Sequence, residues 1–388
     1  MDSVYLDHAA TTPIRPEVRA AMAPYQDARF GNASSLHRWG REAASALEGA
    51  RAEVADSLGA KPSEIVFVRG GTESDNLALF GSWRAGRALG RPPRIAVTAI
   101  EHSAVLDAAS ALRDDGATVL VLDVAPDGSL ELEGLSTYLE AAPGLVSVMW
   151  VNNETGLRLP VEAVTALGHK YGAIVHTDAA QAVGKIPVSV ATVPVDLLTA
   201  TGHKINGPKG TGILFVREGT QLHPLLHGGG QERRLRPGTE DVAGAVGFAT
   251  ALRLAMTSQA ETDRRLSTLR TDFEQRIAAA LPDVRIHCGD GQRSAHVSSI
   301  GLPVEDGAGL LMALDLEGLA VSGGSACHSG AGAGSHVIAA LYGSDDRYAT
   351  VRFSFGYGTS EKDVERAASI TADVARRFAP ISREIPVS

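Results

Sequence analysis

AIVHTDAAQAVGKIPVSVATVPVDLLTATGHK, residues 173–204, contains two short apolar runs, and each leads into residues that can carry chemistry. The first run, Ala173–Asp178, ends in an aspartate. The second, Asp196–Ala200, leads into Thr201-Gly202-His203-Lys204. Continuous apolar runs of this length are typical of strands that are buried on both faces of a parallel sheet. This stretch therefore predicts two neighbouring core strands with polar groups at their carboxyl ends.

Similar apolar runs lie on both sides of this stretch. They predict further strands at Glu64–Val68, Arg94–Ile100, Thr118–Val124, Leu145–Val151 and Gly212–Val216. Segments with helical periodicity separate several of them, for example Ser35–Leu58, which Gly59 is placed to end. This alternation predicts an α/β fold with a mostly parallel seven-stranded sheet and helices on both faces. The last two strands are too close for a helical crossover, so one of them should run antiparallel.

The pattern changes near residue 255. A long amphipathic helix around Leu266–Ile277 comes first. Strands are then predicted at Val284–Cys288, His296–Leu302, Leu319–Val321 and Thr350–Phe355, with a helix around Leu310–Leu319. A last helix should start at Thr359 or Ser360, where a hydroxyl can cap it. We therefore expect a large α/β domain over residues 15–255 and a smaller α+β domain formed by residues 1–14 and 256–388.

Composition narrows the class of protein. The 388 residues carry a net charge of -9, which argues against a broad electrostatic grip on nucleic acid or on an anionic membrane. The sequence has neither a signal-peptide pattern nor an apolar run near the roughly 20 residues of a membrane helix. Two cysteines, Cys288 and Cys327, imply no disulfide framework, and no metal-ligand cluster stands out. We expect a cytoplasmic protein without direct contact to nucleic acid or membrane.

Polar residues follow the first strands of the predicted sheet, where ligands bind in open α/β folds. Glu64–Val68 is followed by Arg69–Ser74, a glycine-containing turn that opens a helix and could hold a phosphate on its first N–H groups. His102 follows Arg94–Ile100 and could stack on a flat cofactor ring, although a lone histidine there is more often structural. The segment 152–156 is a plain turn unless something polar needs its amides.

The opening stretch holds the strongest chemical candidates. Asp178 lies beneath a sheet of apolar residues and needs a partner, because a buried unpaired charge is costly. A protonated pyridine nitrogen is one such partner, and the pairing makes the ring a stronger electron sink. Lys204, just after a buried strand, can lose its proton there and form a Schiff base with an aldehyde. An isolated Gly-His-Lys would more often be a solvated loop.

Cys327 lies in the segment Ser322–Ser335, which is rich in Gly, Ser and Ala. Such a segment can carry its cysteine to more than one place, and an exposed cysteine is a plausible nucleophile once its thiolate is favoured. The neighbouring His328 could favour the thiolate or simply be solvated. By contrast, Cys288 lies in an apolar strand pattern and is expected in the core.

The order of these features along the chain resembles the cysteine desulfurases. The motifs that carry the resemblance are Tyr5-Leu6-Asp7-His8-Ala9-Ala10-Thr11-Thr12, Gly31-Asn32, Gly71-Thr72-Glu73-Ser74-Asp75-Asn76, Glu101-His102, Val151-Asn152-Asn153-Glu154, His176-Thr177-Asp178-Ala179-Ala180-Gln181, Gly202-His203-Lys204, Gly228-Gly229-Gly230-Gln231-Glu232, Pro237-Gly238-Thr239, Ser325-Ala326-Cys327 and Val351-Arg352-Phe353-Ser354. The resemblance extends from about residue 4 to 375.

This resemblance implies a fold-type I transferase dependent on pyridoxal 5'-phosphate (PLP) that works as a homodimer. The cofactor would be held by Lys204 as a Schiff base, Asp178 at the ring nitrogen, His102 on the ring, Gln181 at the ring hydroxyl, and Gly71, Thr72, Thr201 and His203 at the phosphate, with Thr239 from the other subunit. Asn153, close to the cofactor, Arg352 and Asn32 would bind the substrate. L-Cysteine would become alanine, with its sulfur passing to Cys327 as a persulfide and then to an acceptor protein.

The family resemblance leaves some points open. Either free Lys204 or His102 would remove the α-proton. The segment from Cys327 to Ser335 has the length of the long-loop branch but departs in composition, with Gly330–Gly334 in place of a more varied sequence. The chain start and the Ser-Ala-Cys-His context look closest to actinobacterial members, which include the desulfurase for DNA phosphorothioation. Iron–sulfur desulfurases share every catalytic motif.

Two other interpretations keep part of the same chemistry. An aminotransferase or a selenocysteine lyase of the same fold would use Lys204 and Asp178 but would not need Cys327. A catalytically idle scaffold for a sulfur-transfer or DNA-modifying complex would not need to retain the cofactor residues, so the sequence disfavours it.

Overall fold

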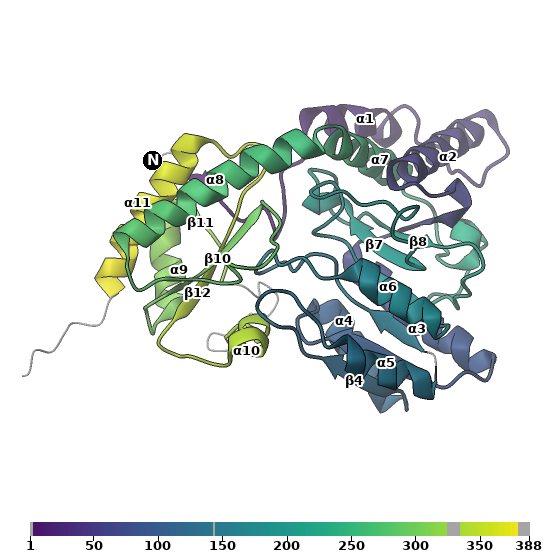
Figure 1. The fold of residues 1–388 in the computed structure, drawn as a ribbon. Helices are drawn as coiled ribbons and strands as arrows, with labels where there is room; N and C mark the ends of the chain where they lie inside the picture. Colours follow the sequence, from purple (N-terminus) through teal and green to yellow (C-terminus); the bar gives the residue numbers. More distant parts are fainter. Residues whose placement is uncertain (1–2, 143, 324–333, 379–388) are drawn as a thin grey trace, which may run out of the picture.

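The computed structural model describes residues 3–142, 144–323 and 334–378. Its centre is a seven-stranded sheet in the order β2-β8-β7-β6-β5-β3-β4 (Figure 1). The strands are β2 (Ile65–Val68), β3 (Arg94–Thr98), β4 (Thr118–Leu122), β5 (Leu145–Ser147), β6 (Ile174–Asp178), β7 (Leu197–Thr201) and β8 (Gly212–Val216). β8 runs antiparallel to both of its neighbours, and the other pairings are parallel. The predicted sheet, including one antiparallel strand, is confirmed.

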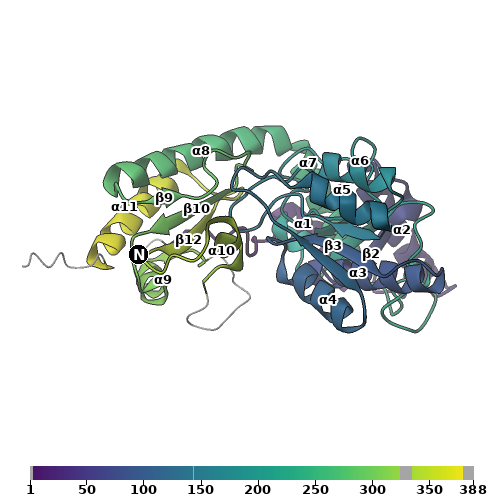
Figure 2. The same cartoon turned by 60° about the horizontal axis from the view of Figure 1, so that its bottom comes forward.

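Helices cover both faces of this sheet (Figure 2). The helices are α1 (Pro16–Gln26), α2 (Arg38–Leu58), α3 (Gly71–Ala88), α4 (Ser103–Asp114), α5 (Leu132–Ala141), α6 (Val161–Lys170) and α7 (Val242–Thr257). Apolar side chains of α3 and α4 pack with Val66 and Ile95 on one face. Those of α2, α5, α6 and α7 pack with Ile65 and Val175 on the other. Successive strand residues thus enter different cores, as the pleat requires.

A second group of elements forms its own core. It contains β9 (Arg285–Ile286), β10 (Val297–Leu302), β11 (Leu319–Ala320), β12 (Ala349–Ser354), α8 (Gln259–Ala280), α9 (Gly307–Leu316), α10 (His336–Tyr342) and α11 (Glu361–Phe378). The antiparallel sheet β12-β10-β9 packs beneath α8 and α11, with the Phe273 and Phe353 rings 4.6 Å apart. β1 (Val4–Tyr5) joins this group by pairing in parallel with β11.

The N-terminal segment connects this group to the seven-stranded sheet. Leu6 donates its N–H to the carbonyl of Ala320 at 2.9 Å, and Thr12 donates to the carbonyl of His203 at 2.9 Å. Residues 6–12 therefore extend from β11 in the second group of elements to the carboxyl end of β7.

Several predicted boundaries were wrong. Leu145–Val151 is a strand only to Ser147; beyond it, Val148 and Trp150 still donate to carbonyls of β6 residues, but no regular ladder continues. The helix predicted at Leu310–Leu319 begins at Gly307, where the Asp306 side chain caps it, and ends at Leu316. The last helix begins after Ser360, and Ser360 and Asp363 bond to each other's N–H groups, which confirms the predicted cap.

The predicted strand Val284–Cys288 also needs correction. β9 contains only Arg285–Ile286, and Cys288 lies beyond it with a left-handed φ of 54°. Its N–H donates to the Tyr342 hydroxyl at 2.7 Å, so a side chain replaces the strand partner. Cys288 is nevertheless 2% exposed, so its predicted place in the core is confirmed.

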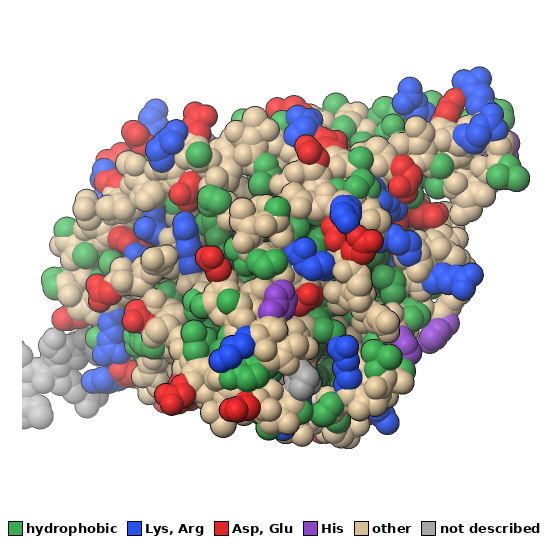
Figure 3. Space-filling model, turned by 45° about the vertical axis from the view of Figure 1, so that its right-hand side comes forward, with side chains coloured by type: hydrophobic (Ala, Val, Ile, Leu, Met, Phe, Trp, Pro, Cys, Tyr) green, Lys and Arg blue, Asp and Glu red, His purple; other side chains and the backbone are tan. Residues whose placement is uncertain are grey.

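The surface carries mixed charge. On the face drawn in Figure 3, acidic and basic side chains are interspersed. Among the described residues, no helix is both long and apolar enough to cross a bilayer.

Candidate active site

A cavity of about 290 Å³ lies at the carboxyl ends of the central strands. Ten of the residues predicted to bind cofactor or substrate line it: Gly71, Thr72, His102, Asn153, Asp178, Gln181, Thr201, His203, Lys204 and Arg352. They come from segments that are far apart in the sequence. The cavity gathers them because parallel strands end at the same edge of the sheet.

One end of the cavity is rich in hydrogen-bond donors. Gly71 and Thr72 open α3, where the first N–H groups of a helix have no partner within it. Gly70 before them has a φ of 134°, a conformation that glycine adopts readily. Thr201 and His203 follow β7 and face the same cavity. Together these groups are suited to hold a phosphate.

Asp178 is the last residue of β6 and is 7% exposed. Its Oδ1 accepts a hydrogen bond from the Ala180 N–H at 2.9 Å. Burial raises the pKa of this carboxyl, while that hydrogen bond and the nearby His102 and Lys204 oppose the rise. A cation bound in the cavity would favour the ionised form.

Two more buried carboxyl groups lie near Asp178, and the sequence analysis assigned them no role. Burial raises the pKa of Asp75 well above its usual value, with Asp178 adding to the rise. Burial also raises the pKa of Glu101 to about 8. Asp75 Oδ1 and Glu101 Oε2 have no hydrogen-bond partner among the described residues. A cation bound beside these carboxyl groups would favour their ionised forms.

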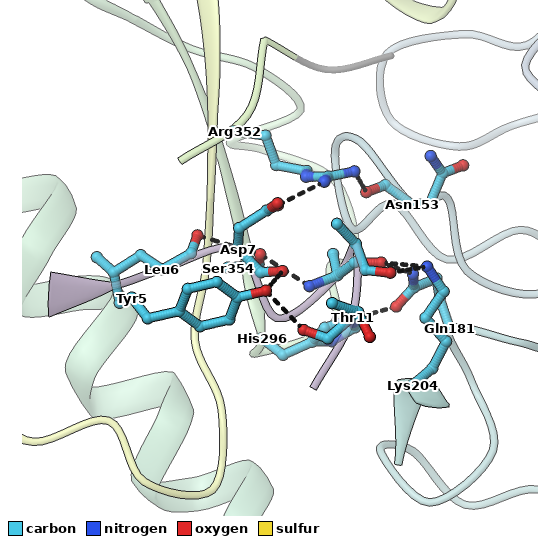
Figure 4. Close-up of polar contacts among 12 residues, drawn as sticks. Tyr5, Leu6, Asp7, Thr11, Asn153, Gln181, Lys204, His296, Arg352 and Ser354 are labelled. Atoms are coloured by element: carbon cyan, nitrogen blue, oxygen red, sulfur yellow. Dashed lines mark hydrogen bonds and ion pairs between the residues drawn. The ribbon is translucent and has the colours of Figure 1, made fainter. Parts of the chain in front are cut away.

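Lys204 lies in the short turn that follows β7. Its Nζ donates to the carbonyl oxygens of Ala9 at 2.6 Å and Ala10 at 2.7 Å (Figure 4). The N-terminal segment therefore holds the amine at the cavity.

His102 caps the N-terminus of α4. Its Nδ1 accepts a hydrogen bond from the Ala104 N–H at 3.1 Å, which leaves Nε2 as the protonated nitrogen of the neutral ring. Burial lowers the pKa of His102, with Lys204 and His336 acting in the same direction and Asp178 opposing them. The neutral ring fits stacking on a flat cofactor, and it could accept a proton only if Nδ1 gave up its bond from the Ala104 N–H.

Arg352 enters the cavity from β12 of the smaller sheet. It is 2% exposed, and its guanidinium donates to Asp7 Oδ1 at 2.8 Å and to the carbonyl of Asn153 at 3.0 Å (Figure 4). The planar guanidinium can bind a carboxylate through two parallel bonds. Arg352 and Asn153 thus lie together, as a carboxylate site requires.

Three predicted site residues are not among those that line the cavity. Asn32 does not line the cavity; its Oδ1 accepts from the Ser34 N–H at 2.9 Å in the segment before α2. Thr239 is exposed and does not line the cavity either. Cys327, together with His328, lies outside the described residues.

The ends of the segment that contains Cys327 are held beside the cavity. Ser322 pairs with Arg352 through two backbone hydrogen bonds, of 2.7 and 3.3 Å. Ser335 donates its hydroxyl to the buried carboxylate of Glu154, and Glu154 and His336 both line the cavity. Glu154 was named only as part of the motif Val151-Asn152-Asn153-Glu154, and His336 was not predicted as a site residue. The only signal for His336 was its position next to the cysteine segment.

The donor set fits pyridoxal phosphate. A helix end with free N–H groups, a buried carboxyl group at a strand end and a lysine amine share one cavity. These are the groups that a phosphorylated pyridine aldehyde needs. Lys204 would hold its aldehyde, Asp178 its ring nitrogen, and Gly71, Thr72, Thr201 and His203 its phosphate.

Comparisons with known proteins agree with this geometry. The aminotransferase class-V family model matches residues 4–367. An IscS-like cysteine desulfurase of Mycobacterium tuberculosis is 42% identical over 383 residues, covering 96% of each chain. The cysteine desulfurase IscS of Dictyoglomus turgidum is 38% identical over 380 residues, covering 98% of this chain and 96% of that protein.

Solved structures show the same fold. A NifS-like protein superposes with a TM-score of 0.89 at 32% identity, covering 97% of this chain and 100% of that one. SspA in complex with cysteine gives a TM-score of 0.80 at 31% identity, covering 91% and 99%. DndA from Streptomyces lividans gives 0.76 at 34% identity, covering 90% and 99%. The chain therefore belongs to the class-V aminotransferase family and, within it, to the cysteine desulfurases, which are PLP-dependent enzymes.

Proposed function

We propose that this enzyme converts L-cysteine to L-alanine and transfers the sulfur to Cys327 as a persulfide. The observation that carries the proposal is the attachment of Ser322 and Ser335 beside the cavity. Cys327 is five residues along the chain from Ser322. The segment that carries it therefore begins and ends beside the cavity that Arg352 lines.

Each residue of the cavity is assigned a separate role in the reaction. Arg352 and Asn153 hold the substrate carboxylate, and Asp178 holds the ring nitrogen of the cofactor. Bound PLP supplies an electron sink for the pair of electrons released with the α-proton. The base is either Lys204, held by two backbone carbonyls, or the neutral His102.

Sulfur transfer then needs the thiolate of Cys327. The thiolate attacks the sulfur atom of the bound cysteine, forming an S–S bond as the C–S bond breaks. The electron pair of the broken bond stays with the β-carbon, which takes up a proton. The base returns a proton to the α-carbon, and the product leaves as alanine. The persulfide stays on the enzyme for the acceptor.

A single-turnover assay with L-cysteine tests this assignment. Cys327→Ser should keep the visible absorbance of bound cofactor but form no persulfide. Cys288→Ser is the matched control, because Cys288 is 2% exposed and its backbone N–H is bonded to Tyr342. We expect Cys288→Ser to produce alanine and persulfide in equal amounts, like wild type. Normal sulfide release by Cys327→Ser would remove the role given to Cys327.

We propose that the enzyme works as a homodimer in which Thr239 contacts the phosphate bound by the other subunit. Thr239 is exposed and lies outside its own cavity. Large apolar side chains are also exposed near Asn32: Phe30 by 73%, Leu36 by 91% and Trp39 by 52%. Such a patch is typical of an interface, and Asn32 would approach the second subunit with it. Sedimentation analysis should give a dimer. Thr239→Val should weaken cofactor retention while the protein remains a dimer.

The sulfur is proposed to pass to an acceptor protein, for DNA phosphorothioation or for iron–sulfur and thio-cofactor synthesis. The neighbour DndA favours the first route, and the IscS relatives favour the second. Net charge of -9 and interspersed surface charges favour a protein acceptor over direct DNA contact. Duplex binding at physiological salt would contradict this. We further propose a cytoplasmic location, because a reducing compartment keeps the Cys327 thiol available.

A further inference from the structure

Gln181 is held by three groups at the edge of the cavity. Gln181 is only 3% exposed. Its Nε2 donates to the carbonyl of Ala9 at 2.9 Å, and its Oε1 accepts from His296 Nε2 at 3.0 Å (Figure 4). Oε1 also accepts from Lys185 Nζ. The Ala9 carbonyl can only accept, so the amide nitrogen must face it and the amide oxygen must face Lys185 and His296.

This arrangement leaves one amide hydrogen for the cavity. Nε2 carries two hydrogens, and only one goes to Ala9. Among the described residues, no acceptor takes the second, and Gln181 lines the cavity. Gln181 can therefore offer a donor, and not an acceptor, to a ligand there.

The two groups that fix the amide come from different parts of the chain. Lys185 follows β6, whereas His296 immediately precedes β10 of the smaller sheet. His296 Nδ1 lies 2.6 Å from the Ser294 hydroxyl, which donates to it when Nε2 carries the ring proton. Burial lowers the pKa of His296 well below its usual value, so the ring is neutral. Its single N–H is thus committed to Gln181.

Lys185 is a second buried amine beside Lys204. Burial lowers its pKa far below the usual value, and Lys204 and Arg352 lower it further while Asp178 opposes them. Lys185, Lys204 and His296 together line a small second cavity of about 60 Å³. Neither Lys185 nor His296 lines the main cavity. Both therefore act on a bound ligand through Gln181 or through charge.

We propose that Lys185 and His296 are positioning residues that lock the Gln181 amide so that it donates a hydrogen bond to the ring oxygen of the bound cofactor. The inference rests on the proposed function, because it requires PLP in this cavity. A donor at that oxygen stabilises its ionised form. It thereby weakens the hold of that oxygen on the proton of the neighbouring Schiff-base nitrogen, and the spectral pKa of bound PLP falls.

Removing the lock should raise the spectral pKa. In Lys185→Met the amide oxygen loses one of its two donors, and only Ala9 and His296 still orient the amide, so its donor hydrogen is held less firmly toward the ring. We expect the midpoint of the absorbance change of bound PLP, titrated with pH, to rise by about one unit, equivalent to roughly 1.4 kcal/mol. Loss of any residual charge on Lys185 would act in the same direction, so a second variant must separate the two causes.

Lys185→Gln supplies that separation, because it keeps an N–H donor but carries no charge. We expect a midpoint close to that of wild type. The other charged and titratable groups that act on this site are Lys204, Arg352, Asp178, His102, His8, His203, Arg158 and Arg270, and all are unchanged in these variants. Lys362→Met, at an exposed position on α11, is the control for the substitution itself.

A double-mutant cycle tests whether Lys185 acts through Gln181. Gln181→Met removes the amide, so adding Lys185→Met should cause no further shift. Additive shifts, an unshifted Lys185→Met, or a Lys185→Gln that shifts as far as Lys185→Met would each overturn the inference. If Lys185→Met does not fold, His296→Leu replaces it in the same cycle. A wild-type protein without a visible PLP band would instead refute the proposed function.

Discussion

A buried ion pair holds the segment that leads to Thr239. Arg51 on α2 donates to the Glu232 carboxylate through two bonds, of 2.7 and 2.8 Å, and the Phe67 N–H donates to the same carboxylate at 2.9 Å. The side chains are 8% and 3% exposed. We predict that Glu232→Ala strongly destabilises the protein, because it removes the buried partner of the Arg51 guanidinium and leaves the largely exposed Glu48 as its remaining ion pair.

The expected magnitude follows from burial and from backbone conformation. Removing one partner of a buried ion pair costs about 3–5 kcal/mol. Glu232, Arg233 and Arg234 also have φ values of 43°, 57° and 66°, in the left-handed region that non-glycine residues rarely adopt. Such conformations persist only where the surroundings enforce them. We therefore expect the segment 231–239 to rearrange as well, which should weaken cofactor retention if Thr239 binds phosphate.

Urea unfolding tests this prediction, because the midpoint and the slope of the transition give the free energy of unfolding. Arg51→Met/Glu232→Met should be more stable than either single variant, because no buried charge is left unpaired. Glu218→Ala is the matched control: its partner is Lys61, and their side chains are 71% and 65% exposed. An exposed pair contributes little, so the control midpoint should stay close to wild type. A Glu232→Ala midpoint equal to that of Glu218→Ala would refute the reasoning.

Three further predictions concern the cavity. Asp178→Asn should keep the cofactor but slow alanine formation at least tenfold, because an opposite charge shifts a pKa by about 1–3 units; an unchanged single-turnover rate would contradict it. Arg352→Lys should raise KM for L-cysteine about tenfold, because a charged hydrogen bond contributes roughly 1.5–3 kcal/mol, with an unaltered visible spectrum; an unaltered KM would count against the carboxylate site. Burial raises the pKa of Glu101 to about 8, so wild type should lose stability as pH rises from the unfolded pKa of Glu101, about 4.5, towards 8. Glu101→Gln should lose less, because only Asp75 and Asp178 then keep raised pKa values among these carboxyl groups. Parallel urea midpoints for both proteins across that range would exclude this assignment.

The large sheet was predictable because its strands are apolar on both faces. Each run from Glu64–Val68 to Gly212–Val216 contains a strand of the observed sheet. The ends were less predictable, because an apolar side chain can stay buried after the ladder stops. Trp150, for example, is 9% exposed although β5 ends at Ser147. Cys288 shows the same limit, since a tyrosine hydroxyl takes the place of a strand partner there.

The site residues at strand ends were predictable from topology and chemical type. Asp178, Lys204 and His102 follow strands, and the sheet brings those ends to one cavity. The supporting residues were not predictable in this way. His296 is 115 positions from Gln181 in the sequence, and nothing in its neighbourhood marks it as a partner of that amide. Such contacts arise only when the smaller sheet packs against the larger one.

The N-terminal segment explains why the two sheets share one site. Its Ala9 and Ala10 carbonyls accept both the Lys204 amine and the Gln181 amide. The same segment bonds to β11 at Leu6, and Asp7 pairs with Arg352 of β12. Lys204 therefore depends on a segment that continues from β1 in the smaller core, and Arg352 faces a cavity built on the larger sheet. Neither sheet alone provides both the amine and the guanidinium, so the cavity forms only where the two meet.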